Sequence, residues 1–384
     1  MDLENTLLRA GILLSGFLFS GWAACWLTLR VRNHAITHGW VDPPNHRSSH
    51  QQPIPRIGGV AIIAAFFIGI LAFQLLQVSV PMVRDLVDQP PLLFLVAALF
   101  IGLLGLYDDF KGLGAWRKLA GQSLAALLVI TAGYRFNLSL FPGMEGTPAG
   151  EVFSFLLTFA WIVGLMNAVN LIDGLDGLAA GISAIAVSAL TIVTALRGAG
   201  ADLVFVAVFL GSLFGFLRHN FHPATIFMGD SGSLFLGFLL ATFALQATPT
   251  AAPLLSFLPV LLILGIPITD TLLSILRRAA SGNGLMTADR DHIHHRLRER
   301  LGLSHRNAVL TLYGVSCCLA AFAVLLTIPL PLNLSLMSLL CCAGMMIYFV
   351  ARLGYLSFLE KQQRGRWLST LTHSPFGKSL RHSR

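Results

Sequence analysis

The sequence predicts an all-α, polytopic membrane protein, a helical bundle with about eleven transmembrane helices. Apolar residues make up 55% of the 384 residues and charged residues only 11%, and the mean hydropathy is +0.74. A soluble chain carries roughly 25% charged residues. So few charges could not cover a surface in water, so lipid must cover much of the protein.

Apolar segments recur to the end of the chain without a long polar insert. A bilayer core takes about 20 apolar residues per helix. We expect spans near residues 8–29, 58–80, 92–107, 117–133, 152–169, 178–196, 202–218, 231–247, 253–276, 308–328 and 334–352. Together they predict one membrane domain over 1–353. The basic tail over 354–384 is expected to lie on the anionic cytoplasmic surface of the membrane lipids.

Lys and Arg predict the orientation. With the N-terminus outside, only Arg9, Arg84, Arg135 and Arg197 lie outside, and the other 22 of the 26 basic residues lie inside. We therefore expect an outer N-terminus and a cytoplasmic C-terminus. The net charge of +8 is spread over short loops and the tail, which argues against a nucleic-acid partner.

Two of the five polar segments on the predicted inner side precede residue 115. The segment 42–59 carries His50 and Arg56 just before a helix start, although a basic inner loop would look the same. In YDDFKG, Asp108 and Asp109 are adjacent carboxylates at the membrane boundary, and they repel each other unless a cation neutralises them. Lys111 could supply that cation in a solvated loop.

The segment NAVNLIDGLDGLAAG, residues 167–181, has a polar residue at every third position. On a helix this spacing drifts slowly around one face, so four polar groups could point at one cavity. These residues are Asn167, Asn170, Asp173 and Asp176. A helix N-cap would explain one Asp but not two Asp and two Asn.

The segment HPATIFMGDSGS, residues 222–233, places Asp230 before small residues at the start of a span. Backbone N–H groups at a helix N-terminus suit a phosphate or a metal-bound anion, and a simple N-cap is the alternative.

The segment ADRDHIHHRLRER, residues 288–300, mixes histidines with Arg290 and further arginines. At i and i+3, His292 and His295 are expected on one helical face, with His294 off it. The zinc-protease pattern H-E-x-x-H is absent. Such a cationic group suits a diphosphate or a lipid phosphate, and a basic cytoplasmic loop is the alternative.

All five segments fall on one side of the predicted bilayer, which places a candidate active site at the cytoplasmic face. The acids could hold one divalent metal and the bases could hold phosphates. Oxygen ligands with phosphates suit Mg²⁺, or Mn²⁺, better than zinc. Asp270, inside the ninth span, is a further candidate because acids in a membrane are usually functional, although it could instead support a helix bend.

From residue 42 to residue 300 the chain resembles the bacterial polyprenyl-phosphate N-acetylhexosamine-1-phosphate transferase family. The motifs YDDFKG, NAVNLIDGLDGLAAG, FMGDSGS and DRDHIHHRL appear in the family's order and spacing. The eleven spans and the HIHH segment look more like the GlcNAc-1-phosphate branch than the muramoyl-pentapeptide branch. The stretch RSSHQQPIPRIGG looks like O-antigen-type members, which leaves the sugar open.

The resemblance implies a role for each matching residue. Asp230 looks like the direct Mg²⁺ ligand, Asp108 and Asp109 lie near the metal and the lipid phosphate, and Phe227 stacks on uracil. We assign catalysis to Asp108, Asp109, Asp173, Asp176, His292, His294 and His295. We assign metal binding to Asp230, Asp108 and Asp109. We assign substrate binding to Asn167, Asn170, Phe227, Arg56, His50, Lys111, Asp270 and Arg290.

The resemblance implies transfer of N-acetylhexosamine 1-phosphate from a UDP-sugar to undecaprenyl phosphate at the bacterial inner membrane, with release of UMP. The product would start a cell-envelope glycan such as O-antigen. UDP-GlcNAc is the expected donor, and another UDP-N-acetylamino sugar is the alternative. Direct attack by the lipid phosphate, a two-step route through a phosphorylated Asp, and a homodimer all stay open. An ion-coupled transporter, the rival class, predicts acids near mid-bilayer.

Overall fold

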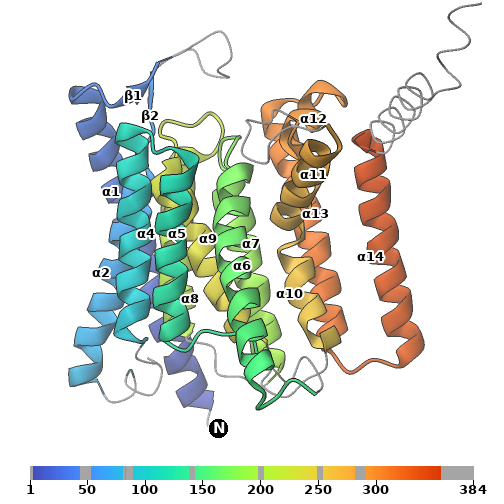
Figure 1. Ribbon diagram of the computed structural model, residues 1–384. Helices are drawn as coiled ribbons and strands as arrows, with labels where there is room; N and C mark the ends of the chain where they lie inside the picture. Colours follow the sequence, from blue (N-terminus) through green and yellow to red (C-terminus); the bar gives the residue numbers. More distant parts are fainter. Residues whose placement is uncertain are drawn as a thin grey trace, which may run out of the picture.

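The computed structural model describes residues 3–43, 53–80, 83, 90–137, 143–197, 203–248, 254–281 and 291–355. Within them the chain is a bundle of helices that run between two opposite ends (Figure 1). The helices are α1 (Leu3–Thr37), α2 (Gly59–Ser79), α4 (Leu92–Lys111), α5 (Ala115–Thr131), α6 (Pro148–Ile172), α7 (Leu178–Leu196), α8 (Leu203–Asn220), α9 (Gly229–Gln246), η2 (Leu254–Phe257), α10 (Leu258–Ile263), α11 (Gly265–Ser281), α12 (Ile293–Glu299), α13 (His305–Thr327) and α14 (Leu332–Arg352).

The predicted all-α membrane fold is confirmed. Every expected span overlaps a helix, and the ninth is divided among η2, α10 and α11. Within the described residues, eight helices are long and apolar enough to cross a bilayer: α1, α2, α4, α6, α7, α8, α13 and α14. The eleven crossings stay a prediction, because α5 is short and α9 opens with the polar run GDSGS.

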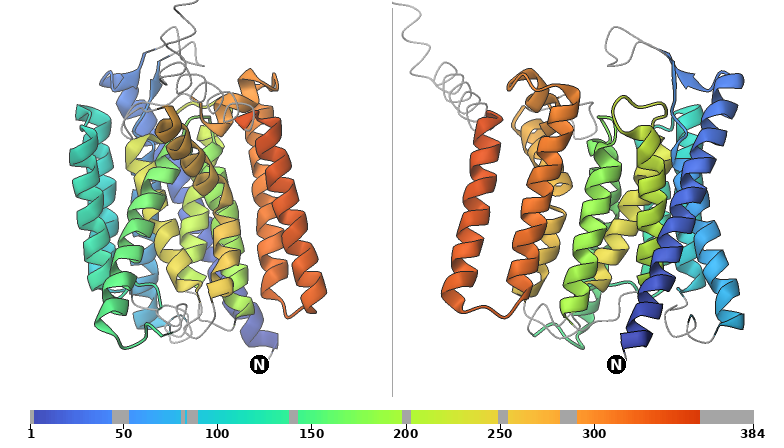
Figure 2. Two further views of the ribbon diagram at one scale, coloured as in Figure 1. Left: turned by 45° about the vertical axis from the view of Figure 1, so that its right-hand side comes forward. Right: turned by 180° about the vertical axis from the view of Figure 1, so that it is seen from behind.

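Helix α9 is the centre of the bundle and packs against α2, α4, α6 and α7 (Figure 2). Its side chains are buried on all sides, as expected for a helix that is apolar around its whole circumference. Phe235 and Phe238 contact the rings of Phe66 in α2 and Phe94 in α4. Ser231 and Ser233 are buried too, so the first turn of α9 also lies inside protein.

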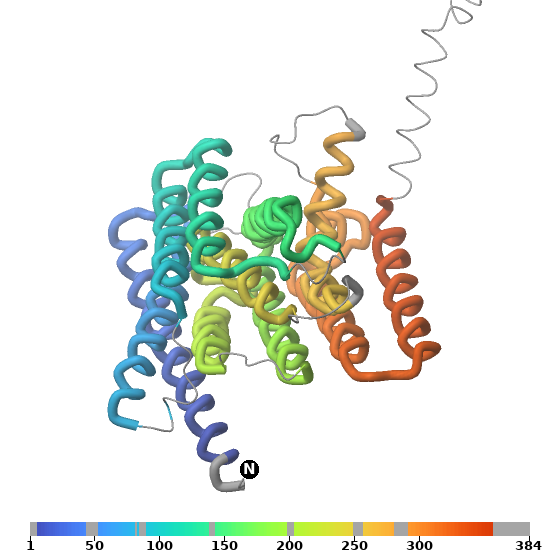
Figure 3. Tube along the Cα trace, turned by 60° about the horizontal axis from the view of Figure 1, so that its bottom comes forward, coloured from blue at the N-terminus to red at the C-terminus, as the bar shows by residue number. Residues whose placement is uncertain are grey.

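The described parts of the α1–α2 connection, together with the α4–α5, α6–α7 and α8–α9 connections and α12, lie at one end of the bundle, at the top of Figure 1. The N-terminus lies at the other end. At the upper end β1 (Val41–Asp42) and β2 (Ile54–Pro55) form an antiparallel pair, with Val41 opposite Pro55. All the segments that sequence analysis singled out thus reach the same end, wherever the structure describes them. Figure 3 shows α13 and α14 at the edge of the bundle, with α14 packed on α13.

Helix α4 approaches α9 through a glycine. A Cβ on Gly105 would lie 2.6 Å from the carbonyl carbon of Asp230 and 2.6 Å from the Cα of Ser231. Both are backbone atoms, so they cannot turn aside as a flexible side chain could. Gly105 therefore sets how closely the acidic end of α4 lies to the start of α9.

We predict that Gly105→Ala lowers the stability of the protein by about 1–3 kcal/mol, as expected for overpacking a close-packed contact. Thermal unfolding in detergent measures it. Gly164→Ala in α6 is the matched control, since its added Cβ meets no described atom within 4 Å. That control should be neutral or slightly stabilising. Equal midpoints for the two variants would contradict the role given to Gly105.

Candidate active site

The N-terminus of α9 is closed by a carboxylate from α4. Asp109 accepts hydrogen bonds from the backbone N–H groups of Asp230 at 2.7 Å and Ser231 at 3.0 Å. A helix leaves its first N–H groups unpaired, and an anion there is stabilised by them and by the helix dipole. We expected these amides to face a phosphate or a metal-bound anion, but Asp109 takes that place in the structure.

Asp109 belongs to a carboxylate cluster that also contains Asp108 and Asp230. Lys118, in α5, connects the latter two. Its Nζ lies 3.0 Å from Asp108 Oδ2 and 3.0 Å from Asp230 Oδ1. Asn170 completes the arrangement, because its Nδ2 donates to Asp230 and, at 2.8 Å, to the hydroxyl of Ser233. The sequence analysis missed Lys118 and considered Lys111 as the partner cation. Lys111 lies exposed at the end of α4.

The expectation of four polar groups along one helical face is wrong. Helix α6 ends at Ile172, and residues 173–177 form a turn before α7 begins at Leu178. Gly177 has φ = 77°, a conformation that glycine adopts at little cost. The turn sends Asp173 and Asp176 to different neighbours. Asn167, one turn back from Asn170 in α6, pairs with Gln122 in α5, donating at 2.7 Å.

Asp173 lies beside the carboxylate cluster. Its pKa is raised to about 7 by burial, and then by the negative charges of Asp230 and Asp109. The positive charge of Arg56 opposes part of this shift. Near neutral pH the Asp173 carboxyl is therefore divided between its protonated and ionised forms.

A cavity of about 340 Å³ opens at this end of the bundle. Asp173, Asp176, Asp230 and Asn170 line it, together with Arg56, Asp42 and Phe227. The strand β2 places Arg56 there, because Pro55 O accepts from Phe227 N at 2.7 Å and Phe227 O accepts from Gly58 N at 2.9 Å. Asp42, from β1, was not singled out from the sequence. His50 and Arg290 lie outside the described residues.

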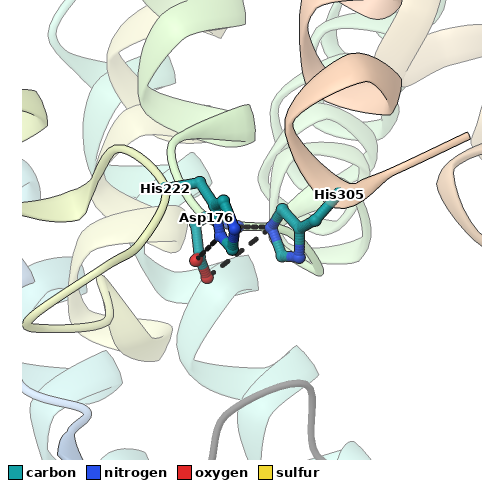
Figure 4. Close-up of side chains that lie close together, drawn as sticks. All are labelled: Asp176, His222 and His305. Carbon is teal, nitrogen blue, oxygen red and sulfur yellow. Dashed lines mark hydrogen bonds and ion pairs between the residues drawn. The ribbon is translucent and has the colours of Figure 1, made fainter.

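Asp176 faces two histidines that the sequence analysis missed (Figure 4). His222 Nδ1 lies 2.7 Å from Asp176 Oδ2, and His305 Nε2 lies 3.7 Å from Asp176 Oδ1. His305 Nε2 also accepts from the Asp176 backbone N–H at 2.9 Å. The histidine rings stack at 4.3 Å between centroids. His222 is the first residue of the segment HPATIFMGDSGS. Its place in that segment, before Pro223 and near Asp230, was the sequence signal that could have identified it.

Two groups in the described residues have donor atoms that suit a cation. The ligand atoms of Asp176, His222 and His305 lie within 4.8 Å of one another, but each already takes part in hydrogen bonds within the group. In the carboxylate cluster, two oxygens converge on one ammonium. Carboxylate and amide oxygens are hard ligands of the kind that Mg²⁺ and Mn²⁺ take, so Asp108, Asp230 and Asn170 fit such an ion.

The histidine segment adopts a different arrangement from the expected one. His292 precedes α12, and its Nδ1 lies 2.8 Å from Asp270 Oδ2, while Asp270 Oδ1 accepts from Ile293 N at 2.7 Å. His292 therefore does not share a helical face with His295. It stacks in parallel with His294, 5.8 Å away. Among the described residues, Asp270 is not one of those that line the cavity. Its carboxylate instead caps the N-terminus of α12.

His294 is the histidine that reaches the 173–177 turn. Its ring occupies the space where a Cβ of Gly174 would lie, so the two residues are in direct contact. Burial lowers the pKa of His294 to about 3. The ring is therefore neutral at physiological pH, and not protonated as we expected.

The chain is similar to a known family of membrane enzymes. The family model "Glycosyl transferase family 4" matches residues 91–248. The probable undecaprenyl-phosphate N-acetylglucosaminyl 1-phosphate transferase of Bacillus subtilis is 36% identical over 81% of this chain and 84% of its own length. The decaprenyl-phosphate N-acetylglucosaminephosphotransferase of Mycolicibacterium smegmatis is 40% identical over 74% of each chain.

A phospho-N-acetylmuramoyl-pentapeptide-transferase of Synechococcus is 32% identical over 82% of this chain and 88% of its own. The family model covers every segment that builds the carboxylate cluster, and the described part of the chain is a membrane bundle with those acids at one end. The chain belongs to glycosyl transferase family 4.

Proposed function

We propose that this protein transfers N-acetylglucosamine 1-phosphate from UDP-GlcNAc to undecaprenyl phosphate at the cytoplasmic face of the inner membrane. One observation carries the proposal: Asp108, Asp230 and Asp173 converge beside a polar cavity that Arg56 and Phe227 also line. The names of the relatives support the sugar phosphate and the lipid acceptor.

The reaction that fits is attack by an oxygen of the lipid phosphate on the β-phosphorus of the UDP-sugar. A new P–O bond forms, the bond from the β-phosphorus to the bridging oxygen breaks, and UMP leaves with that oxygen. Phe227 offers an aromatic face to the uracil, and Arg56 offers a bidentate donor to phosphate oxygens. His294 can donate one neutral N–H to the diphosphate.

Asp109 supports the one-step route. Both of its oxygens are held by the N–H groups at the start of α9, so it positions Asp230 rather than offering a free nucleophile. The second pKa of a phosphate monoester lies near ~6, so much of the lipid phosphate is dianionic at neutral pH without a base. Trapping a phosphosugar or UMP adduct on Asp109 would instead establish the two-step route.

Asp108, Asp230 and Asn170 would hold a divalent cation, Mg²⁺ or Mn²⁺. Such an ion neutralises charge on the diphosphate and on the departing UMP. Lys118 lies between the two carboxylates, and it is the group that would make way for the ion or share the site with it.

The transporter alternative is not favoured by the described residues. It predicts acids near the middle of the bilayer, whereas those that form the cavity lie at helix ends on one side of the bundle. The donor alternative is separate, since one relative is named for an N-acetylmuramoyl-pentapeptide substrate. A screen of UDP-N-acetylamino sugars for UMP release decides between donors.

We predict Mg²⁺-dependent release of UMP from UDP-GlcNAc in the presence of undecaprenyl phosphate. Asp230→Asn should lower kcat by about 10²–10³-fold, because it removes a charge that the site needs in the transition state. Glu151→Gln, at an exposed carboxylate at the other end of the bundle, is the matched control and should keep full activity. A wild-type protein that is inert with every UDP-N-acetylamino sugar would exclude the proposal.

The raised pKa of Asp173 predicts a proton release on metal binding. Since this carboxyl keeps its proton up to about pH 7, cation binding should displace up to one proton at pH 6–7 and little at pH 8.5. Affinity for Mg²⁺ should rise over the same interval. Calorimetry in two buffers of different ionisation enthalpy counts the protons. Asp173→Asn should abolish the release, and an unchanged release in that variant would assign it to another group.

The position of Lys118 between two carboxylates predicts that Mg²⁺ binding and thermal stability are linked. Lys118→Met leaves Asp108 and Asp230 without their shared cation, so the metal-free variant should unfold at a lower temperature than the wild type. Mg²⁺ should raise the melting temperature of the variant more than that of the wild type, because the ion replaces the missing positive charge. The same increment in both proteins would contradict a shared site.

A further inference from the structure

Helix α14, the last helix of the described chain, is mostly exposed along its length, whereas residues just after its C-terminal end are buried. Along α14 only Ser338 and Cys342 are buried, and most other side chains are exposed. Two of the three residues after its C-terminal end behave differently: Leu353 is 0% exposed and Tyr355 is 2% exposed. A helix that is exposed along its length but buried at its tip makes its main contact there.

Gly354 turns the chain at this tip. Its φ is 71°, and its N–H donates to Ala351 O at 2.8 Å, which ends the helix as glycine commonly does. The turn brings Tyr355 against α12, the short helix that carries the histidines.

Tyr355 packs on a buried charge of α12. The guanidinium of Arg296 lies 3.9 Å from the centre of the Tyr355 ring, and the guanidinium of Arg277 from α11 lies 5.4 Å from it. The Tyr355 hydroxyl donates to Asp291 O at 2.8 Å. Burial raises the pKa of this hydroxyl to about 12, so it stays a donor at all physiological pH.

Arg296 takes two of its contacts from this end of the chain, the Tyr355 ring and the Leu353 carbonyl oxygen. It is 2% exposed, and it donates to the Asp291 carboxylate at 2.7 Å and to Leu353 O at 3.2 Å. A buried charge is costly unless it is paired, and an aromatic face adds to its stabilisation. If the Tyr355 ring is removed, Arg296 loses the aromatic face against its guanidinium, and a shift of Arg296 toward water would carry α12 with it.

Helix α12 cannot hold its own position. It has seven residues, too few for a helix to be stable without tertiary contacts. Asp270 holds its N-terminal end through His292 and Ile293, and Arg296 holds the following turn through Tyr355 and Leu353. Between these two anchors lies His294, whose ring contacts Gly174 beside Asp173.

We infer that Tyr355 is a positioning residue of the active site: through Arg296 it holds α12 so that His294 rests on the 173–177 turn. The inference rests on the proposed function for its catalytic consequence, but not for its structural one. On this inference, the residues that follow α14 help to position a site whose other residues come from α4, α5, α6 and α9.

Two substitutions of Tyr355 separate its ring from its hydroxyl. Tyr355→Phe keeps the face under Arg296 and loses only the bond to Asp291 O, so kcat should stay within about 3-fold of the wild type. Tyr355→Ala removes the face, and kcat should fall by about 10- to 100-fold, since a displacement of about 1 Å in a positioned group can cost that much. KM for the UDP-sugar should change less. Tyr348→Ala, at an exposed tyrosine of α14, is the matched control.

Histidine NMR of the full-length protein in detergent tests the structural half without any activity. The His294 signal, assigned by its loss in His294→Asn, should not titrate between pH 5 and 8 in the wild type, Tyr355→Phe or Tyr348→Ala. In Tyr355→Ala it should titrate toward its ordinary pKa, because the ring loses its buried place. A His294 signal that stays silent in Tyr355→Ala would overturn the inference, even if the wild type has no transferase activity.

A double variant separates positioning from general weakening. If Tyr355 acts through His294, adding Tyr355→Ala to His294→Asn should lower kcat no further. If the two losses multiply, Tyr355 acts elsewhere and the inference is wrong. A wild type that is inert with every donor rejects the proposed function alone, because the NMR result still decides the position of His294.

Discussion

The site depends on one hydrogen-bonded contact, that between Asp109 and the first amides of α9. Because α9 is buried on all sides, its N-terminal N–H groups need partners from the protein, and leaving them unpaired would be costly. Asp109 supplies them and so fixes the end of α4 against α9, where Gly105 lets the two backbones come close. Its neighbour Asp108 is then within reach of Lys118, which also pairs with Asp230.

The turn between α6 and α7 lies between the carboxylate cluster and the histidines of the site. Asp173, at the start of the turn, is close enough to the carboxylate cluster for the charges of that cluster to raise its pKa. Asp176, near the end of the turn, faces His222 and His305. Between them Gly174 has no side chain, and the ring of His294 uses that space. The shape of five residues therefore sets the distance between the acids that suit a cation and the histidines of α12. A longer side chain at Gly174 could not be accommodated without moving one of them.

The fold was predictable because it follows from local composition: apolar length predicts each helix, and polar breaks predict the connections. The site was predictable only in part. Asp108, Asp173 and Asp230 could be grouped since they lie in distinctive polar runs at the same end. Lys118 could not, because a lysine at the start of the expected span 117–133 looks like any basic residue at a membrane boundary until α5 lies beside α4. The single helical face over 167–176 failed because two glycines favoured a turn over continued helix, which periodicity alone does not weigh.

Charge balance gives the strongest physical reason to expect a cation at this site. The carboxylate cluster and the neighbouring Asp173 have two cations near them, Lys118 and Arg56, so this part of the site tends toward excess negative charge. The protein relieves part of this excess by holding a proton on Asp173 up to about pH 7. Both proposed substrates are phosphate anions, so they would meet repulsion from the cluster at close range. A divalent ion held by Asp108, Asp230 and Asn170 would remove that repulsion and would displace the proton at the same time. Metal binding, the charge state of Asp173 and the entry of a diphosphate are on this argument a single coupled equilibrium.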